Sequence, residues 1–258
     1  MKNIISWIDQ YLAVLLLVIF VVVVLVIVGF FSRQSIQSTV DLSWPNCNRL
    51  SNASYALAIV GSNGGLDFKP NPCLGNEIRM SNKFVLYANS GNPGFPLISK
   101  FKRRGPLICP KYNNLICYSF NYGYQAAEYS IRQANLAAAA GSTFWWIDVE
   151  SINSWTNSID ANRADIEGMV FAFQANRFLT PKVGIYTAYN QWLSVVGHWN
   201  NSLELWLGTG DTSLLQAKQS CRQPSFIGKS IALSQYTVGN LDFNFSCSHW
   251  QVKNYFTD

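Results

Sequence analysis

Residues 144–150 read FWWIDVE, an apolar aromatic run that ends in two acids. A short run of this composition is typical of a buried strand. Residues two apart on a strand share a face, so Asp148 and Glu150 are expected to project together, with Cα atoms about 7 Å apart. The carboxyl end of a strand is also where β/α barrels carry their reactive groups. The stretch therefore predicts one strand of a barrel with a candidate catalytic pair at its end.

Seven other short apolar, β-branched or aromatic runs are bounded by turn residues in the same way. They are residues 39–43, 56–60, 84–88, 183–187, 203–207, 231–236 and 241–245. Helical patterns lie between several of them, most clearly at 125–140 and 160–178. Alternating strands and helices indicate a mainly parallel sheet. We expect an α/β fold, an irregular TIM-like (β/α) barrel with eight strands and fewer helices, in which 63–82 and 90–114 form long loops.

The apolar content is concentrated near the N-terminus. Residues 11–31 carry no charge, and 21 helical residues span roughly 30 Å of hydrocarbon. We predict a cytoplasmic N-terminus at 1–10, a transmembrane anchor at 11–31, a tether at 32–38 and a barrel domain at 39–258. The alternative is a signal peptide whose cleavage releases a secreted protein, but such a peptide has an apolar core of about 7 to 15 residues and a small-residue cleavage site. Residues 29–33 read GFFSR and offer no such site.

All six cysteines follow this apolar segment. An even number on that side fits an oxidising exterior, so we expect a single-pass protein with its N-terminus inside and its barrel domain extracellular. Six cysteines allow fifteen pairings. Proximity in sequence favours Cys47 with Cys73, Cys109 with Cys117, and Cys221 with Cys247, and buried free thiols are the alternative.

Composition excludes several classes of function. The net charge is +5, but the 19 Lys and Arg residues are scattered apart from a short run at 100–104, and no basic stripe predicts nucleic-acid binding. Two histidines, His198 and His249, and the absence of a Cys-x-x-Cys pair argue against a zinc site. No metal or organic cofactor is expected. No Ser or Cys nucleophile has a His nearby in motif context, which argues against a peptidase.

Two further acids lie at the ends of strand candidates. Asp41 belongs to the first strand and Asp242 to the last, so closure of the barrel would bring both to the mouth beside Asp148 and Glu150. Burial near tryptophan rings raises the pKa of a carboxyl, and a protonated acid beside an ionised one suits glycosidic cleavage. Asp165-Ile166-Glu167 has the same acid spacing within a helical pattern, where residues two apart diverge around the axis. We interpret that pair as a solvated helix face.

Aromatic and amide side chains near the strand ends form a second candidate set. The aromatic rings are expected to stack on sugar faces or, alternatively, to fill the core, and they are Trp44, Tyr87, Tyr122, Trp146, Tyr186, Trp206 and Tyr236. The amides expected to bind sugar hydroxyls are Asn63, Asn89 and Asn121.

The order of these segments resembles the family 25 glycoside hydrolases over about residues 39–246. The segments are VDLS at 40–43, WIDVE at 146–150, VGIY at 183–186, LW at 205–206, SQY at 234–236 and DFN at 242–244. The resemblance implies a β/α barrel with fewer helices than strands and lysozyme activity on peptidoglycan. It also implies that Glu150 is the general acid, that Asp148 stabilises the acetamido group or the intermediate, and that Asp41 and Asp242 are supporting acids.

Other segments resemble a subgroup of exported lysozyme-like barrel proteins of Gram-positive bacteria. They are SWPNC at 43–47, VGSNGG at 60–65, NPCL at 71–74, NSGNPG at 89–94, and residues 118–123 and 145–150. This likeness supports the cysteine pairing given above. Two stretches depart from the lysozymes of the family: residues 59–65 lack their Lys and Glu-Gly, and 118–120 read YSF in place of Tyr-His-Phe.

We therefore expect a membrane-anchored, exported glycosidase whose partner is a cell-wall or other envelope glycan. Glu150 would protonate the departing oxygen, and Asp148, Asp41 and Asp242 would stabilise positive charge at the anomeric carbon or position water. The two departures favour an alternative, a catalytically inactive glycan-binding or scaffold domain on the same barrel.

Overall fold

The computed structural model describes residues 14–26, 38–47, 55–110, 114–139, 141–175 and 182–247. The chain divides into two compact units, Met1–Gln37 and Ser38–Asp258.

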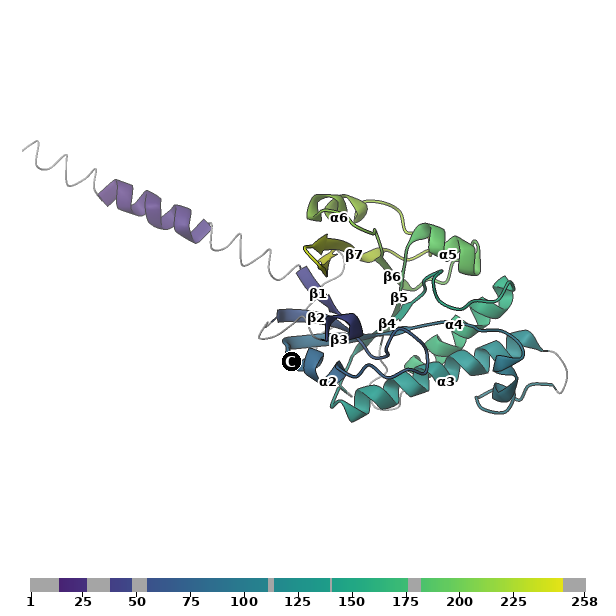
Figure 1. Ribbon diagram of the computed structural model, residues 1–258. Coiled ribbons are helices and arrows are strands. Elements are labelled where there is room, and N and C mark those ends of the chain that lie inside the picture. The colour runs from purple at the N-terminus through teal and green to yellow at the C-terminus, as the bar shows by residue number, and fades with distance from the viewer. Residues whose placement is uncertain are drawn as a thin grey trace, which may run out of the picture. The chain divides into compact units, whose positions relative to one another are not determined.

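The second unit is built on eight strands that close into a barrel in sequence order, which confirms the predicted α/β barrel (Figure 1). The strands are β1 (Ser38–Leu42), β2 (Tyr55–Gly61), β3 (Ser81–Asn89), β4 (Phe144–Asp148), β5 (Lys182–Thr187), β6 (Glu204–Leu207), β7 (Ile231–Val238) and β8 (Leu241–Ser246). Neighbours from β1 to β7 pair in parallel, whereas β8 is antiparallel to both β7 and β1. Only Gly239 and Asn240 join β7 to β8, and such a tight turn permits a hairpin but no parallel crossover.

The helices outside the barrel are unequal in length. They are α2 (Leu74–Arg79), α3 (Leu115–Leu136), α4 (Ile159–Gln174), α5 (Tyr189–Val196) and α6 (Leu214–Ser220), with 3-10 turns η1 (Trp44–Asn46) and η2 (Leu97–Phe101). Among the described residues of the two regions predicted to be loop-rich, α2 and η2 form short helical turns, and β3 begins at Ser81 near the end of the first. The first long helix begins ten residues before the predicted start at 125, because the Asn114 side chain accepts a hydrogen bond from the Cys117 amide and caps it.

Helices α3 and α4 lie side by side against one side of the barrel (Figure 1). Two glycines permit this approach. A Cβ atom at Gly123 would overlap the carbonyl oxygen of Asp165, and one at Gly168 would overlap the carbonyl oxygen of Phe120. The two helix backbones are therefore in direct contact, and side chains on the facing surfaces are shielded from water.

Side chains that alternate along the strands fill two separate cores, as expected for a barrel. Trp145 points outward and stacks on Phe173 of α4, with ring centroids 4.4 Å apart. Trp146 points inward and packs against Phe144 and Trp206 inside the barrel. The polar side chains of the mouth lie above this inner aromatic layer.

The three disulfides pair the cysteines as predicted: Cys47–Cys73, Cys109–Cys117 and Cys221–Cys247. These bonds, the strand pairings and the apolar clusters are all formed within residues 38–247. The barrel unit therefore contains the interactions that it needs to fold on its own.

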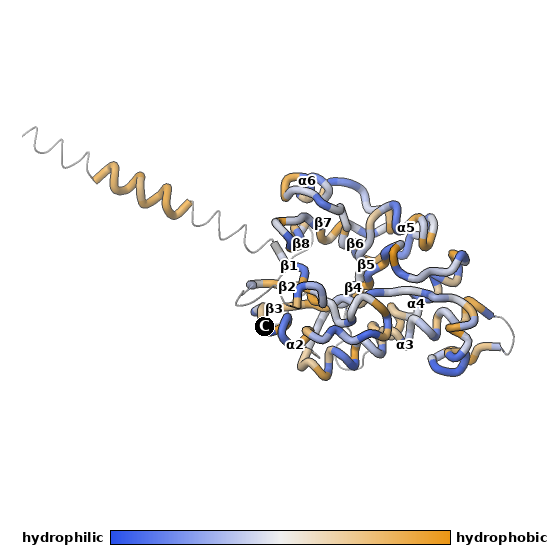
Figure 2. Tube along the Cα trace, in the orientation of Figure 1, coloured by the Kyte–Doolittle hydropathy of each residue, from blue (hydrophilic) through white to orange (hydrophobic). Residues whose placement is uncertain are grey.

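The first unit contains a helix at residues 14–26, whose apolar character is evident in Figure 2. Its large side chains are exposed, from Val24 at 40% to Phe20 at 66%. The rest of the predicted anchor, residues 11–13 and 27–31, lies outside the described residues, as do residues 1–10 and 32–37 of the predicted N-terminus and tether. Within the described part of the chain, no helix has both the length and the apolarity needed to cross a membrane.

Candidate active site

The four predicted acids come from strand ends that meet at the mouth of the barrel. Asp41 lies near the end of β1, Asp148 ends β4 and Glu150 follows two residues later. Asp242 lies at the start of the antiparallel β8, where it pairs with Thr237 near the end of β7. Closure of the sheet thus places acids from opposite ends of the sequence at one edge.

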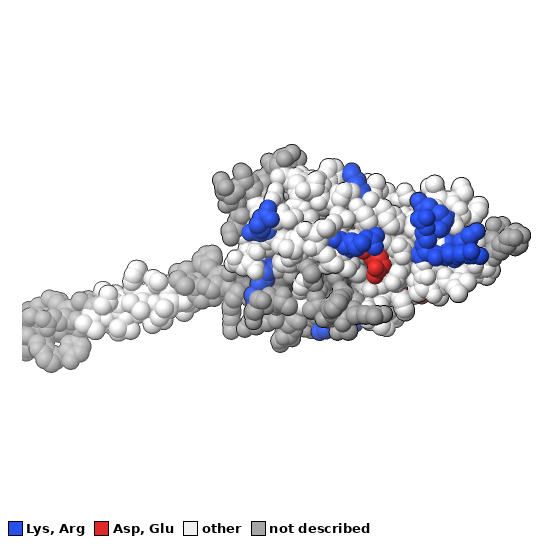
Figure 3. All heavy atoms as spheres, turned by 90° about the horizontal axis from the view of Figure 1, so that it is seen from below, with Lys and Arg blue, Asp and Glu red and all other residues white. Residues whose placement is uncertain are grey.

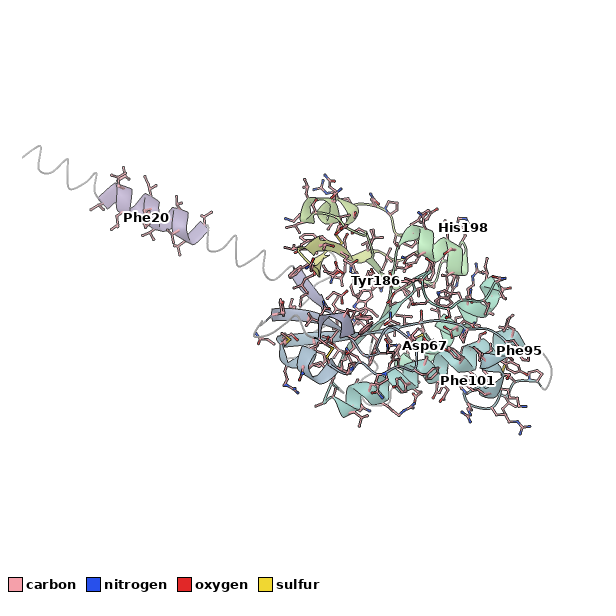
Figure 4. All side chains as sticks on the ribbon, in the orientation of Figure 1. Phe20, Asp67, Phe95, Phe101, Tyr186 and His198 are labelled. Atoms are coloured by element: carbon pink, nitrogen blue, oxygen red, sulfur yellow. A yellow bond between two sulfur atoms is a disulfide. The ribbon has the colours of Figure 1, made fainter. Side chains whose placement is uncertain are left out.

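Tyr186 of β5, labelled in Figure 4, lies opposite Asp148 in the pairing of β4 with β5. Burial raises the pKa of its hydroxyl well above the ordinary value, and the negative charges of Asp148, Glu150, Asp41 and Asp242 all add to that increase. Its hydroxyl therefore lies in the field of all four carboxyl groups.

Asp148 has the most enclosed carboxyl group of this set, with 4% of the residue exposed. The Asn89 side-chain amide donates a hydrogen bond to it. Asn63 holds Asn89 in turn, since its Oδ1 accepts from the Asn89 amide at 3.0 Å and its Nδ2 donates to the Asn89 carbonyl at 3.1 Å. Burial and the charges of Glu150 and Asp41 raise the pKa of Asp148 well above its usual range.

Glu150 lies just beyond β4 and is half-buried, whereas Asp148 is buried. The Trp155 indole donates to the Glu150 carbonyl at 2.7 Å and fixes the backbone there. Burial raises the pKa of the Glu150 carboxyl above its ordinary value, while a hydrogen bond from the Gln191 side chain partly opposes that increase. Glu150 is therefore a carboxyl that retains its proton to higher pH than a solvated one.

A short polar chain links Asp41 to Tyr186 across the mouth. The Tyr186 hydroxyl donates to Gln235 Oε1 at 3.0 Å, and Gln235 Nε2 lies 3.5 Å from Asp41 Oδ2. Burial, followed by the charges of Asp242, Glu77 and Glu150, raises the pKa of Asp41 well above its usual range. On the adjoining strand, Thr237 donates to Asp242 Oδ1 at 2.9 Å.

Three residues near the mouth were missed by the sequence analysis. Gln191 and Gln235 hydrogen-bond the acids directly, and Gln235 lies in the SQY segment that the resemblance had already marked. Glu77 of α2 is 1% exposed, accepts a hydrogen bond from Asn71 Nδ2 at 2.7 Å, and has its pKa raised to about 7 by burial. Glu77 falls in a loop-rich stretch whose pattern gave no sign that it would be buried.

The predicted sugar-binding side chains divide by exposure. Trp44 is 43% exposed and Lys69 lies 4.9 Å from its ring centroid, and Tyr186 is half-buried. The other members of the set are buried, including Tyr87 at 9% in the inner aromatic layer. Trp146, Trp206, Tyr236 and Asn63 are at most 6% exposed and Asn89 is 9% exposed.

This burial corrects the prediction for several of those residues. Trp206 donates to Asn244 inside the barrel at 2.6 Å, and Trp146 packs in the same inner layer. Asn121 binds the carbonyls of Phe101 and Leu107 rather than a hydroxyl of a sugar. These side chains support the site from below or beside it because their polar atoms and rings are already occupied by protein.

Tyr122 contacts a second group of buried acids rather than the four at the mouth. Its hydroxyl donates to Asp67 Oδ2 at 2.7 Å at the wall of a side pocket of about 440 Å³, between the loops that follow β2, β3 and β4. Asp67 is labelled in Figure 4, and burial raises the pKa of its carboxyl to about 7. Asp165 of α4 lies close enough for the charge of Asp67 to raise its pKa further.

The interpretation of Asp165 and Glu167 as a solvated helix face was therefore wrong for Asp165. Asp165 is 0% exposed, whereas Glu167 is exposed. The reason is the close packing of α3 on α4 at Gly123 and Gly168, which covers the face of α4 that carries Asp165.

Among the described residues, no group of three or more His, Cys, Asp or Glu side chains is arranged to hold a metal ion. The four acids at the mouth bind to protein amides and hydroxyls, an arrangement suited to moving protons.

Comparisons of sequence connect this geometry with lysozymes. Residues 116–220 match the model of the family described as "Lysozyme-like protein 1". A 71-residue segment is 32% identical to the probable GH family 25 lysozyme 5 of Dictyostelium discoideum. That segment covers 26% of this chain and 32% of the relative, so the match spans about a third of the relative's length.

Comparisons of structure extend the likeness to the whole barrel. The fold is similar to that of a family GH25 lysozyme from Aspergillus fumigatus, with a TM-score of 0.53 and 11% identity over 84% of this chain and 97% of that one. It is also similar to the modular autolysin LytC from Streptococcus pneumoniae, with a TM-score of 0.50 and 13% identity over 81% of this chain and 46% of that one. At these identities the likeness shows the fold alone.

Proposed function

We propose that this chain, whose sequence and fold resemble the family 25 glycoside hydrolases, hydrolyses peptidoglycan or a related cell-envelope glycan. The observation that carries the proposal is the position of Asp41, Asp148, Glu150 and Asp242 at strand ends around the barrel mouth, where the charges of all four raise the pKa of Tyr186. Glycosidic cleavage generally uses a pair of carboxyl groups beside the scissile bond. The LytC structure was determined in complex with a synthetic peptidoglycan ligand, which supports this class of substrate.

Glu150 is the residue best suited to act as the general acid. It is more accessible than Asp148, and burial keeps its pKa above the ordinary value. A general acid works best when its pKa lies near the working pH, because the proton must be present and yet transferable. Its proton would pass to the glycosidic oxygen as the bond to the anomeric carbon breaks.

Asp148 is suited to stabilise the positive charge that develops on the sugar. It lies deeper than Glu150, where burial raises its pKa, and the Asn89 amide donates a hydrogen bond that opposes this increase and favours the ionised form. The two carboxyls repel one another when both are ionised, so the pair retains a proton more readily than either group would alone. Asp41 and Asp242 would add negative charge on the opposite side of the mouth or position water.

A second function is favoured by one specific observation. Residues 59–65 and 118–120 lack the Lys, Glu-Gly and Tyr-His-Phe of the lysozymes that this chain resembles. The barrel would then bind an envelope glycan without cleaving it and serve as a binding or scaffold domain.

We further propose that the chain is attached to a membrane through residues 11–31, with its N-terminus in the cytoplasm and its barrel outside. The apolar helix at 14–26 and three disulfides in the barrel support this topology. Signal cleavage and secretion are the alternative. Sodium carbonate extraction of membranes, followed by mass measurement of the intact chain, separates the two: an anchored protein keeps residues 11–31 and stays in the membrane pellet.

The enzyme proposal is tested with residues 33–258, which contain the barrel unit, and purified peptidoglycan. We expect release of soluble fragments with new reducing ends, and Glu150→Gln should reduce the rate by about 10²- to 10⁴-fold. Glu167→Gln, which changes an exposed acid of α4, is the matched control and should leave the rate unchanged. Unchanged release by Glu150→Gln would refute the assignment, and saturable glycan binding with no product would establish the binding domain instead.

A further inference from the structure

A second surface of the barrel unit combines positive charge with exposed apolar side chains. It is formed by residues 95–108, which we call the basic loop and which include η2. Four cationic side chains, Lys100, Lys102, Arg103 and Arg104, are exposed on it. In Figure 3 blue side chains gather at the end of the barrel unit that carries this loop.

Large apolar side chains are exposed beside these cations. Ile108 is 93% exposed, Leu97 is 62% and Phe95 is 59%, and Leu107 is also exposed. Phe95 is labelled in Figure 4 at the same end of the unit. Scattered single apolar residues on a surface need no explanation, but several on one short loop mark an interaction site.

The loop is fixed to the barrel unit by its inner face. Ile98 and Phe101 are buried against Tyr118 and Tyr122 of α3. Asn121 Nδ2 donates to the carbonyls of Phe101 and Leu107 at 3.0 and 2.8 Å. These contacts hold the backbone of the basic loop in place, so its exposed side chains extend from a fixed backbone.

The Cys109–Cys117 disulfide ties the end of the basic loop to α3, and the amide of Cys109 donates to the carbonyl of Lys102 at 3.2 Å. Gly105 lies so close to the Asn121 side chain that a Cβ atom there would overlap it. These contacts hold the apolar side chains outward although nothing within the described barrel covers them.

The charge of the basic loop is uncompensated. Residues 95–108 contain no Asp or Glu, and the ion pairs found in the described residues, Arg163–Asp160 and Lys229–Glu204, lie elsewhere. A partner with negative charge and an adjacent apolar phase would satisfy both kinds of side chain at once.

We propose that the basic loop docks the barrel on the surface of an anionic phospholipid bilayer. The cations would contact the headgroups, while Phe95, Leu97 and Ile108 would enter the boundary between headgroups and acyl chains. A soluble polyanion offers charge but no apolar phase, so the exposed apolar side chains favour the bilayer. The proposal does not depend on glycan hydrolysis, because the loop lies outside the four-acid mouth.

The test measures binding of residues 33–258 to vesicles of phosphatidylcholine with and without 30% phosphatidylglycerol, by cosedimentation. We expect binding only to the anionic vesicles and a fall in affinity as salt is raised. Each lysine or arginine near an anionic surface contributes about fivefold to affinity, so replacing Lys100, Lys102, Arg103 and Arg104 by Gln should weaken binding by several hundred-fold.

Two variants complete the test. The combination Arg79→Gln, Arg132→Gln, Arg222→Gln and Lys229→Gln removes the same charge from scattered exposed positions and should retain most of the binding. Phe95→Ser with Ile108→Ser keeps the charge and should weaken vesicle binding at least tenfold. Circular dichroism and peptidoglycan binding or release confirm that each variant is folded.

Three results would overturn the proposal. The first is equal binding to neutral and anionic vesicles, or none to either. The second is an equal loss of binding in the scattered-charge variant. The third is binding to a soluble polyglycerol phosphate that matches vesicle binding and is unchanged by Phe95→Ser with Ile108→Ser, which would assign the loop to a polyanion.

Discussion

Glu77 should destabilise the folded barrel at neutral and alkaline pH. The residue is 1% exposed, and burial raises the pKa of its carboxyl from 4.5 to about 7. The folded protein therefore binds this proton more tightly than the unfolded chain does. Stability falls as the pH rises from about 4.5 to about 7 and is level beyond, and a difference of about 2.5 pKa units corresponds to about 3 kcal/mol.

The substitution Glu77→Gln removes this cost with little change of shape. The side-chain oxygen of glutamine can still accept the hydrogen bond that Asn71 Nδ2 makes at 2.7 Å. At pH 8 we expect Glu77→Gln to be more stable than the wild type by about 3 kcal/mol, or about 6–12 °C in Tm. At pH 4 the wild-type carboxyl is protonated, and the two proteins should agree within about 0.5 kcal/mol.

The assay is urea unfolding of residues 33–258 with the disulfides intact, followed by tryptophan fluorescence at pH 4 and pH 8. Asp211→Asn, which neutralises an exposed acid, is the control and should change stability by less than about 0.5 kcal/mol at both pH values. Equal stability of Glu77→Gln and the wild type at pH 8 would refute the reasoning. Lower stability of the variant at pH 8 would show that the ionised carboxylate has a stabilising partner.

Two further predictions concern helix packing and the acid at the mouth. Gly168→Ala should destabilise the barrel by about 3 kcal/mol or more in thermal unfolding, because the new Cβ overlaps a backbone carbonyl of α3, whereas Gly141→Ala, with nothing within 4 Å, should be nearly neutral. Equal effects of the two changes would contradict this account. Gln191→Leu removes a hydrogen bond that lowers the pKa of Glu150, so the alkaline limb of kcat/KM for peptidoglycan should move to higher pH. A shift to lower pH would show that Glu150 does not act as the proton donor.

The strands were predictable because each has its own local signal. All eight predicted runs overlap observed strands, and the closing order follows from their sequence order. The antiparallel direction of β8 is a consequence of the turn at Gly239 and Asn240, whose shortness is visible in the sequence. The full extent of α3 was less predictable, since its first turns carry Cys, Ser and Asn rather than an Ala-rich pattern.

The acids at the mouth were predictable for a topological reason. A strand fixes the face of each residue, and barrel closure brings the first strand beside the last, so Asp41 and Asp242 could be placed near Asp148 from order alone. Glu77 and Gln191 could not be placed in that way. Both lie on short helices, where their positions depend on tertiary packing that no local period records.

The burial of Asp165 could not be predicted from helical periodicity alone. Residues two apart on a helix do diverge, and Asp165 and Glu167 indeed point to different surroundings, one buried and one exposed. Two side chains that point in different directions from a helix need not both be solvated. Gly168 lies three residues after Asp165 and so shares its side of the helix, and a glycine within a helix often marks close backbone approach. That glycine, with Gly123 on α3, is the local sign that this side of α4 meets another helix rather than water.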